Sequence, residues 1–309
     1  MSDLHVETGR SVGIEVAKRV MTAVCVDANS QIIGQQISDV SFSEPSSSQL
    51  ISFISSLKST FGPFECVGVA VPGLVDSGAK RIAFSTHIPE HSGVDLGGEV
   101  EAATGIQTYI ENDANAAAYG EFRLGAGRES ANMFYATLGL GVGGSLIFGG
   151  EIWRGTTGFA GEFGYVPIDS DGTRLEEVAS TANIIRRTRN RFRQDSTSSL
   201  VDLDENAITI ADIVAAAEAD DDFAKLMLQR TGAYVGTAIA SVINLLNIER
   251  IVIGGEIIQA KSLVLDAVVE RAKELAFGPS FASTTIMQGE LGTVAAAVGV
   301  AILAREDKL

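Results

Sequence analysis

Closely spaced glycines at residues 137–144 are the sharpest chemical signal in this 309-residue sequence, reading Thr-Leu-Gly-Leu-Gly-Val-Gly-Gly. Glycine lets backbone N–H groups turn inward, and such a concavity binds phosphate oxygens. A Rossmann loop would open a helix, whereas this run lies between two β-rich stretches, residues 134–137 and 145–148. The run therefore predicts either a phosphate-binding turn or a tight hairpin whose glycines need positive φ.

A second signal is the dipeptide Asn112-Asp113, which follows a β-rich stretch and precedes an alanine-rich helical pattern. Asp at such a junction commonly caps the helix. A carboxylate at the C-terminal end of a strand, where α/β sheets bind ligands, is equally suited to act as a catalytic base. Asn112 adds a donor and an acceptor for a hydroxyl-rich ligand.

Two further carboxylates, Glu162 and Glu176, lie in or just after a glycine-rich segment at residues 155–164. Glycines around Glu162 indicate a close-fitting loop that presents its carboxylate to a ligand. Paired carboxylates also perform glycosidase chemistry, but that reaction has no use for a phosphate loop.

The elements that must position these residues alternate between strands and helices, which predicts an α/β architecture with mixed sheets. Residues 11–35 and 132–153 share one pattern of two extended stretches joined by a turn, which suggests two related halves. The other expected strands are residues 66–71, 107–110 and 250–253. We expect helices near residues 47–60, 96–104, 180–193, 210–217, 223–247 and 293–305.

Composition excludes several classes of protein. A net charge of −16 argues against a nucleic-acid partner. The basic cluster at residues 186–193 is either a phosphate or nucleic-acid patch or a solvated helix face, and we favour the helix face. No signal peptide is evident, and the apolar residues 231–246 predict a buried helix rather than a membrane span. Two cysteines in apolar runs agree with a cytoplasmic protein.

Taken together, these motifs resemble the ROK family of repressors and sugar kinases. The resemblance rests on residues 69–75, 112–117, 137–144, 154–164 and 251–255, in the family's order. It implies the actin-like ATPase (ribonuclease H-like) fold, with two domains of mixed sheet flanked by helices around a cleft that binds ATP and a hexose. We expect a small N-terminal domain at residues 1–115, completed by a C-terminal helix at 293–309, and a large domain at 116–292.

The resemblance also assigns roles. Asp113 would be the catalytic base, working with ATP and Mg²⁺, and the sugar would contact Gly73, Asn112, Asp113, Glu162, Tyr165 and Glu176. The nucleotide would contact Thr137, Gly139, Gly141, Gly143, Gly144, Gly254 and Gly255.

Two departures from the family pattern stand out. Family kinases open with an Asp-x-Gly-Gly-Thr-Lys turn, but this chain has Glu15-Val16-Ala17-Lys18-Arg19-Val20. Losing both glycines stiffens the turn. Lys18 and Arg19 would either supply cationic donors in compensation or block the site by their bulk. The zinc module, a Gly-His followed by three cysteines, is missing, with Tyr165 in place of the histidine. We therefore expect no structural zinc and no other metal ligands.

These observations predict an ATP-dependent hexose kinase, specifically a glucokinase, that is a homodimer or homotetramer. A donor other than ATP, such as polyphosphate, stays open. Because the first kinase-like strand begins near Val12, we expect no helix-turn-helix domain before it. The alternative is a non-catalytic sugar sensor whose ATP site has decayed, and the altered first turn favours it.

Overall fold

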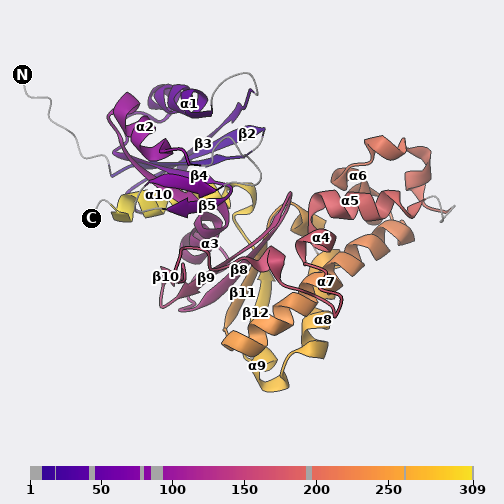
Figure 1. Ribbon diagram of the computed structural model, residues 1–309. Helices are drawn as coiled ribbons and strands as arrows, with labels where there is room; N and C mark the ends of the chain where they lie inside the picture. The colour runs from indigo at the N-terminus through magenta and orange to yellow at the C-terminus, as the bar shows by residue number, and fades with distance from the viewer. Residues whose placement is uncertain are drawn as a thin grey trace, which may run out of the picture. The chain divides into compact units, whose positions relative to one another are not determined.

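The computed structural model describes residues 9–17, 19–41, 46–76, 80–84, 93–192, 197–260 and 262–307. The chain divides into two compact units, each assembled from segments that are distant in sequence (Figure 1). Unit 1 consists of Met1–Arg128, Ile152–Ala160 and Leu291–Leu309, and unit 2 of Glu129–Glu151 and Gly161–Glu290. The division expected from the sequence, at residues 115 and 292, stays a prediction.

Unit 1 is built on a five-stranded mixed sheet with the order β3-β2-β1-β4-β7. The first three strands are antiparallel, and β4 and β7 then continue the sheet in parallel with β1. The strands are β1 (Ser11–Val16), β2 (Val20–Val26), β3 (Ile32–Asp39), β4 (Cys66–Val71) and β7 (Gln107–Asn112). The short strands β5 (Leu74–Asp76) and β6 (Arg81–Phe84) pair separately. The C-terminal ends of the three parallel strands share one edge, where ligands bind in such sheets.

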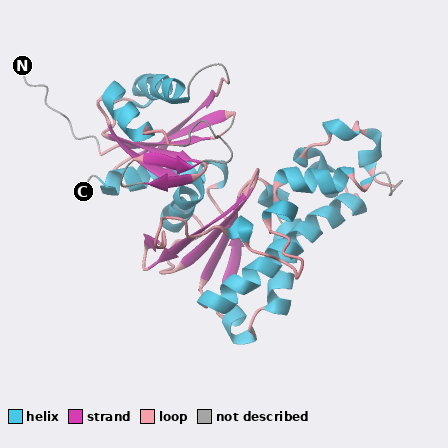
Figure 2. Cartoon of the chain, viewed as in Figure 1, coloured by secondary structure: helices cyan, strands magenta, loops and turns pink. Residues whose placement is uncertain are grey.

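Helices cover both faces of this sheet (Figure 2). Residues of α1 (Ser46–Phe61) and α2 (Leu96–Thr104) form one core with the apolar side chains of β1, β4 and β7. The other face carries α10 (Ala295–Asp307), which also packs on α3 (Asp113–Leu124). A Cβ on Gly13 would lie 1.8 Å from the carbonyl oxygen of Ala297. Glycine is therefore required for α10 to lie this close to the sheet.

Unit 2 repeats the arrangement with the strand order β10-β9-β8-β11-β12. β8 is antiparallel to β9, while β11 is parallel to both β8 and β12. The strands are β8 (Met133–Leu138), β9 (Val142–Phe148), β10 (Glu151–Ile152), β11 (Arg250–Gly254) and β12 (Thr285–Gln288). In both sheets a central antiparallel hairpin is extended by parallel strands, as expected from the two similar hairpins in the sequence.

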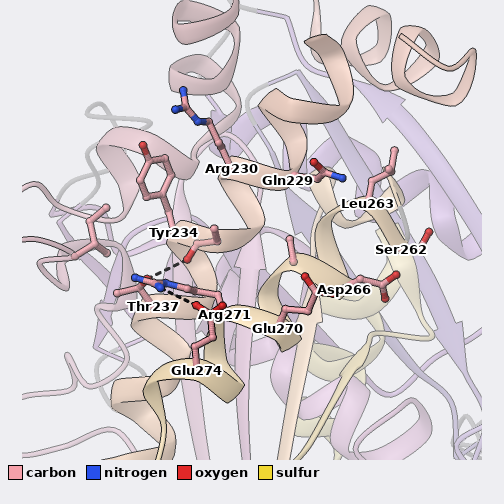
Figure 3. Close-up of a pocket in the computed structure, with 13 residues that line it drawn as sticks. Gln229, Arg230, Tyr234, Thr237, Ser262, Leu263, Asp266, Glu270, Arg271 and Glu274 are labelled. Atoms are coloured by element: carbon pink, nitrogen blue, oxygen red, sulfur yellow. Dashed lines mark hydrogen bonds and ion pairs between the residues drawn. The ribbon is translucent and has the colours of Figure 1, made fainter. Parts of the chain in front are cut away.

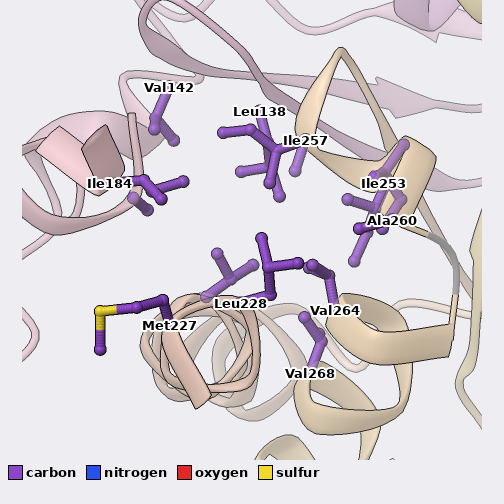
Figure 4. Close-up of a cluster of buried hydrophobic side chains, with 14 of the residues drawn as sticks. Leu138, Val142, Ile184, Met227, Leu228, Ile253, Ile257, Ala260, Val264 and Val268 are labelled. Carbon is purple, nitrogen blue, oxygen red and sulfur yellow. The ribbon is translucent and has the colours of Figure 1, made fainter. Parts of the chain in front are cut away.

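The helices of unit 2 include the 25-residue α7 (Asp222–Leu246), which packs along α8 (Ser262–Leu275). Side chains from α7, α8 and the sheet form one apolar core that contains Leu138, Leu228, Ile253 and Val264 (Figure 4). The remaining helices are α4 (Glu176–Ala179), α5 (Thr181–Arg189), α6 (Ile210–Glu218) and α9 (Gly278–Ala282). In the described part of the chain, no helix has the length and apolarity that crossing a membrane requires.

Candidate active site

Asn112 and Asp113 form the junction between β7 and α3. Asn112 is the N-cap, because its Oδ1 accepts the backbone N–H of Asn115 at 3.0 Å. Its Nδ2 donates to the carbonyl of Gly73 at 2.9 Å and to Oδ1 of Asp113 at 3.0 Å. The interpretation of Asp113 as the cap is therefore wrong, since the preceding residue fills that position. Asp113 is the first helical residue, and its Oδ1 also accepts the N–H of Ala114 at 2.9 Å.

Gly73 reaches this junction from the segment that follows β4. Val71, the last residue of β4, is in register with Asn112 of β7, which explains why the next residues lie beside it. Gly73 has a φ of +119°, a backbone conformation that favours glycine. The structure thus brings together Gly73, Asn112 and Asp113, three of the residues predicted to contact the sugar.

Glu15 is a further acidic residue at this edge. Its position on β1 is in register with Ala70 of β4, which is in register with Glu111 of β7. Burial, followed by the charge of Asp113, raises the pKa of Glu15 to about 7. Glu15 was not among the sequence-predicted site residues, although an acidic side chain within an apolar strand is a recognisable signal of function.

The altered turn after β1 joins β1 to β2. The N–H of Ala17 donates to the carbonyl of Val20 at 2.9 Å, and the carbonyl of Arg19 accepts the N–H of Val40 at 2.9 Å. The side chain of Arg19 is exposed, and Lys18 lies outside the described residues. The role of both side chains in binding nucleotide stays a prediction.

An ion pair with a buried carboxylate adjoins Asn112. Oε2 of Glu111 accepts from Nη2 of Arg154 at 2.5 Å, and the hydroxyl of Tyr109 lies 3.2 Å from the same oxygen. Burial and the charge of Glu111 raise the pKa of Tyr109. Burial lowers the pKa of Arg154, but the charges of Glu111 and Tyr109 and the hydrogen bonds to both residues together outweigh this effect and leave the pKa above its usual value. Neither Glu111 nor Arg154 was predicted as a site residue.

The glycine-rich run forms the hairpin turn between β8 and β9, with the N–H of Gly139 donating to the carbonyl of Gly141 at 3.0 Å. Among the described residues, the glycines with positive φ do not include any of this run, so the expectation of positive φ is wrong. Space explains the need for Gly144, because a Cβ there would lie 2.8 Å from Cβ of Phe163. A Cβ on Gly139 would meet nothing within 4 Å, so the backbone there faces open space.

Gly254 and Gly255 lie next to this turn. Thr137 is in register with Gly143 on one side and with Gly254 on the other. Gly255 has a φ of +92°, and a Cβ on it would lie 2.4 Å from the carbonyl oxygen of Leu138. Thr137, the glycine-rich run and the Gly254-Gly255 pair, all predicted to contact nucleotide, therefore form one cluster in unit 2.

Glu162 and Glu176, both predicted to contact the sugar, precede and follow a short 3₁₀ helix, Phe163–Tyr165, along the chain. Burial, with a smaller contribution from the charge of Glu176, raises the pKa of Glu162. Oε2 of Glu176 accepts the N–H of Val142 at 2.9 Å, which ties this carboxylate to the start of β9. Tyr165 is 54% exposed, and the centroid of its ring lies 4.5 Å from the guanidinium carbon of Arg174. Unit 2 thus holds Glu162, Glu176 and Tyr165 near one another.

The segment that would carry the zinc module is a short hairpin. Pro167 and Arg174 form an antiparallel bridge, and Oδ1 of Asp169 accepts the N–H groups of Asp171 and Thr173, each at 3.0 Å. The described ranges hold no group of three or more His, Cys, Asp or Glu side chains that could bind a metal ion. The absence of zinc stays a prediction.

The arginines of α5 contact neighbouring parts of unit 2. Arg187 donates to Oγ1 of Thr231 at 2.6 Å, and Arg189 donates to the carbonyls of Asn206 and Ile208 at 2.8 and 2.9 Å. The interpretation of this cluster as a solvated face is wrong for these two side chains, because they join α5 to the helices and loops packed against it. Arg193 lies outside the described residues.

A pocket of about 760 Å³ lies between α7 and α8, and the charged residues around it include Arg230, Asp266 and Glu270 (Figure 3). Arg271 in its wall donates to Thr237 at 3.2 Å and to Glu274 at 2.8 Å. None of the sequence-predicted site residues lines this pocket. It is therefore separate from the three groups of predicted site residues described above.

Comparison with known proteins settles the family, because the ROK family model matches residues 11–307. The chain belongs to the ROK family. A glucokinase from Halalkalibacterium halodurans is 31% identical over 253 residues, which cover 78% of this chain and 76% of the relative. The xylose repressor of Bacillus spizizenii is 25% identical over 98% of this chain and 79% of its own length. This ROK chain is thus similar to both kinases and repressors.

Solved structures agree with this assignment. A ROK family glucokinase from Streptomyces griseus, in complex with glucose and AMPPNP, has a TM-score of 0.85 and 26% identity, covering 96% of this chain and all of the other. A ROK family transcriptional regulator, homologous to the E. coli MLC protein, has the same TM-score at 25% identity, covering 97% of this chain and 80% of the other. The predicted actin-like ATPase fold is confirmed.

Proposed function

We propose that this ROK protein is an ATP-dependent hexose kinase, specifically a glucokinase that converts glucose to glucose 6-phosphate. The observation that carries the proposal is the arrangement of Asp113. Its carboxylate stands at the C-terminal edge of the sheet, oriented by Asn112, which itself caps the helix. A carboxylate placed in this way suits a base that accepts a proton from a sugar hydroxyl.

The other residues divide the work of binding. Glu162 and Glu176 accept hydrogen bonds from sugar hydroxyls, and Tyr165 offers a hydroxyl in place of the family's histidine. Asn112 and the backbone of Gly73 hold the reacting end of the sugar beside Asp113.

The phosphoryl donor and its metal fit the side chains that are present. The open backbone at Gly139 leaves room for phosphate oxygens, and the Glu15 carboxylate would help to hold Mg²⁺ through water molecules, which leaves Asp113 free to act as the base. Bound ATP–Mg²⁺ would supply the transferable phosphoryl group and neutralise its charge. Gly254 and Gly255 would border the adenosine, and Lys18 and Arg19 would face the phosphates.

The alternative is a sugar sensor without catalysis. It is favoured by the repressor relatives and by the loss of both glycines from the turn after β1. The orientation of Asp113 favours the kinase, because a sensor needs no base. We further propose that the kinase is cytoplasmic, has no nucleic-acid partner and forms a homodimer or homotetramer, which light scattering would test.

The deciding experiment measures ADP release from ATP–Mg²⁺ with a panel of hexoses and N-acetylhexosamines, repeated with polyphosphate as donor. A glucokinase releases ADP with glucose well above the other sugars. Turnover confined to another sugar would refute glucokinase but retain a sugar kinase. A thermal shift with a hexose but no turnover with either donor would establish the sensor.

A further inference from the structure

The carboxylate of Glu111 is an unusually well-satisfied buried anion. Its side chain is 3% exposed. Oε1 accepts the N–H of Asn112 at 2.9 Å and Nδ2 of Asn115 at 3.1 Å, while Oε2 accepts from Arg154 at 2.5 Å and Tyr109 at 3.2 Å. Buried charges persist where hydrogen bonds satisfy them on every side. Glu111 therefore holds both the end of β7 and the first turn of α3.

Arg154 approaches Glu111 from a segment that is distant in sequence. Ile152–Ala160 belongs to unit 1, although the residues on both sides of it belong to unit 2. The segment is closed by the N–H of Ala160, which donates to the carbonyl of Arg154 at 3.1 Å. Along the chain, Glu162 follows only two residues after its end. The Arg154–Glu111 contact thus fixes the segment that leads into a proposed sugar ligand.

The guanidinium of Arg154 also retains an unused donor. Its Nε is buried and has no hydrogen-bond partner within the described chain. Buried donors are nearly always paired, with protein or with water. Nη2 donates to Glu111 and to the hydroxyl of Tyr109 at 3.1 Å, so Nε is left for a water molecule or a ligand hydroxyl.

We propose that Glu111 and Arg154 are a positioning pair that sets the orientation of the Asn112–Asp113 junction for hexose binding and phosphoryl transfer. The connection runs through three contacts. Arg154 holds Glu111, Glu111 holds the N–H of Asn112, and Nδ2 of Asn112 donates to Asp113. The kinetic part of this inference rests on the proposed kinase function.

A second ion pair in unit 1 serves as a control for the Arg154–Glu111 pair. Lys80 and Glu101 form an ion pair of the same 2.5 Å length in unit 1, and Glu101 accepts the N–H of Thr108 at the other end of β7. Both pairs tie a distant segment to the same strand. Only the Arg154–Glu111 pair adjoins Asp113.

The test compares Arg154→Ala and Glu111→Gln with the control Lys80→Ala. We expect each site variant to lower kcat by at least about 10-fold, since small misplacement of reacting groups is costly, and to raise the KM for the hexose while leaving that for ATP unchanged. Lys80→Ala should leave both parameters unchanged. Added guanidinium ion should partly restore kcat in Arg154→Ala. A fall in melting temperature with unchanged kinetics, as in the control, would overturn the inference.

A readout independent of activity separates this inference from the proposed function. Hydrogen exchange of the Ala160 amide reports whether Ile152–Ala160 is held, and Arg154→Ala should accelerate it at least 10-fold while Lys80→Ala does not. If the wild type binds hexose without turnover, the kinase proposal fails. The positioning pair is then judged by hexose affinity, which Arg154→Ala should weaken. Unchanged exchange and unchanged hexose affinity would refute it.

Discussion

Glu15 is half-buried, and the charge of Asp113 adds to the effect of burial in raising the pKa of Glu15 from 4.5 to about 7. The two carboxylates stand on β1 and directly after β7, strands whose C-terminal ends share one edge of the sheet. Close carboxylates resist joint ionisation and are stabilised by a proton or a cation. This relationship fits a site that receives a metal–nucleotide complex.

A pH-dependent stability follows from the Glu15 pKa. Because the folded protein holds this proton more tightly than the unfolded chain, Glu15 contributes stability below about pH 4.5 that is lost as the pH rises to about 7. Glu15→Gln should remove this dependence. Relative to wild type, the variant should gain on the order of 1 to 3 kcal/mol in the free energy of unfolding between pH 5 and 8. Urea unfolding of both proteins across that range checks it, and a difference independent of pH would contradict it.

The close packing of α10 on the unit 1 sheet gives a stability prediction. Gly13→Ala should destabilise the protein by about 1 to 3 kcal/mol or more, because the new Cβ would lie 1.8 Å from the Ala297 carbonyl. The matched control is Gly278→Ala, whose Cβ would meet nothing within 4 Å and should change stability by less than about 0.5 kcal/mol. Chemical unfolding of both variants measures the difference. Equal effects would refute the close packing.

The hairpin in place of the zinc module predicts a metal-independent fold. Purified protein should contain no stoichiometric zinc, and EDTA should leave its melting temperature unchanged. Asp169→Ala should instead lower the melting temperature, because Oδ1 of Asp169 accepts two backbone N–H groups of the turn. Elemental analysis and thermal melts measure both. About one zinc per chain would show that this interpretation of the loop is wrong.

Most of the helices and strands could be predicted from patterns of neighbouring residues in the sequence. The expected helix at residues 223–247 is α7, Asp222–Leu246, and the expected strand at 107–110 extends to Asn112. The strand continues because Asn112, with an extended backbone, caps the helix. The reason for the glycine at position 144 could not be predicted from the run itself. No glycine of the run, which the structure describes throughout, has a positive φ, and Gly144 is needed because Phe163, outside the run, takes the space of a Cβ.

The candidate site was predicted where a motif is contiguous and missed where side chains meet across strands. Asn112 and Asp113 are adjacent in sequence, so their partnership was visible. Arg154 and Glu111 are 43 residues apart, and only the folded chain brings them together. Glu15 was missed for the same reason, because its raised pKa depends on burial and on Asp113.

The central claim is that Asp113 is the base of a sugar kinase, and Asp113→Asn tests it most directly. The change keeps the size of the side chain and much of its hydrogen bonding but removes the base. We expect kcat for ADP release with glucose to fall by at least about 10²-fold, while the affinity for glucose changes far less. Turnover by Asp113→Asn within a few-fold of wild type would contradict the account.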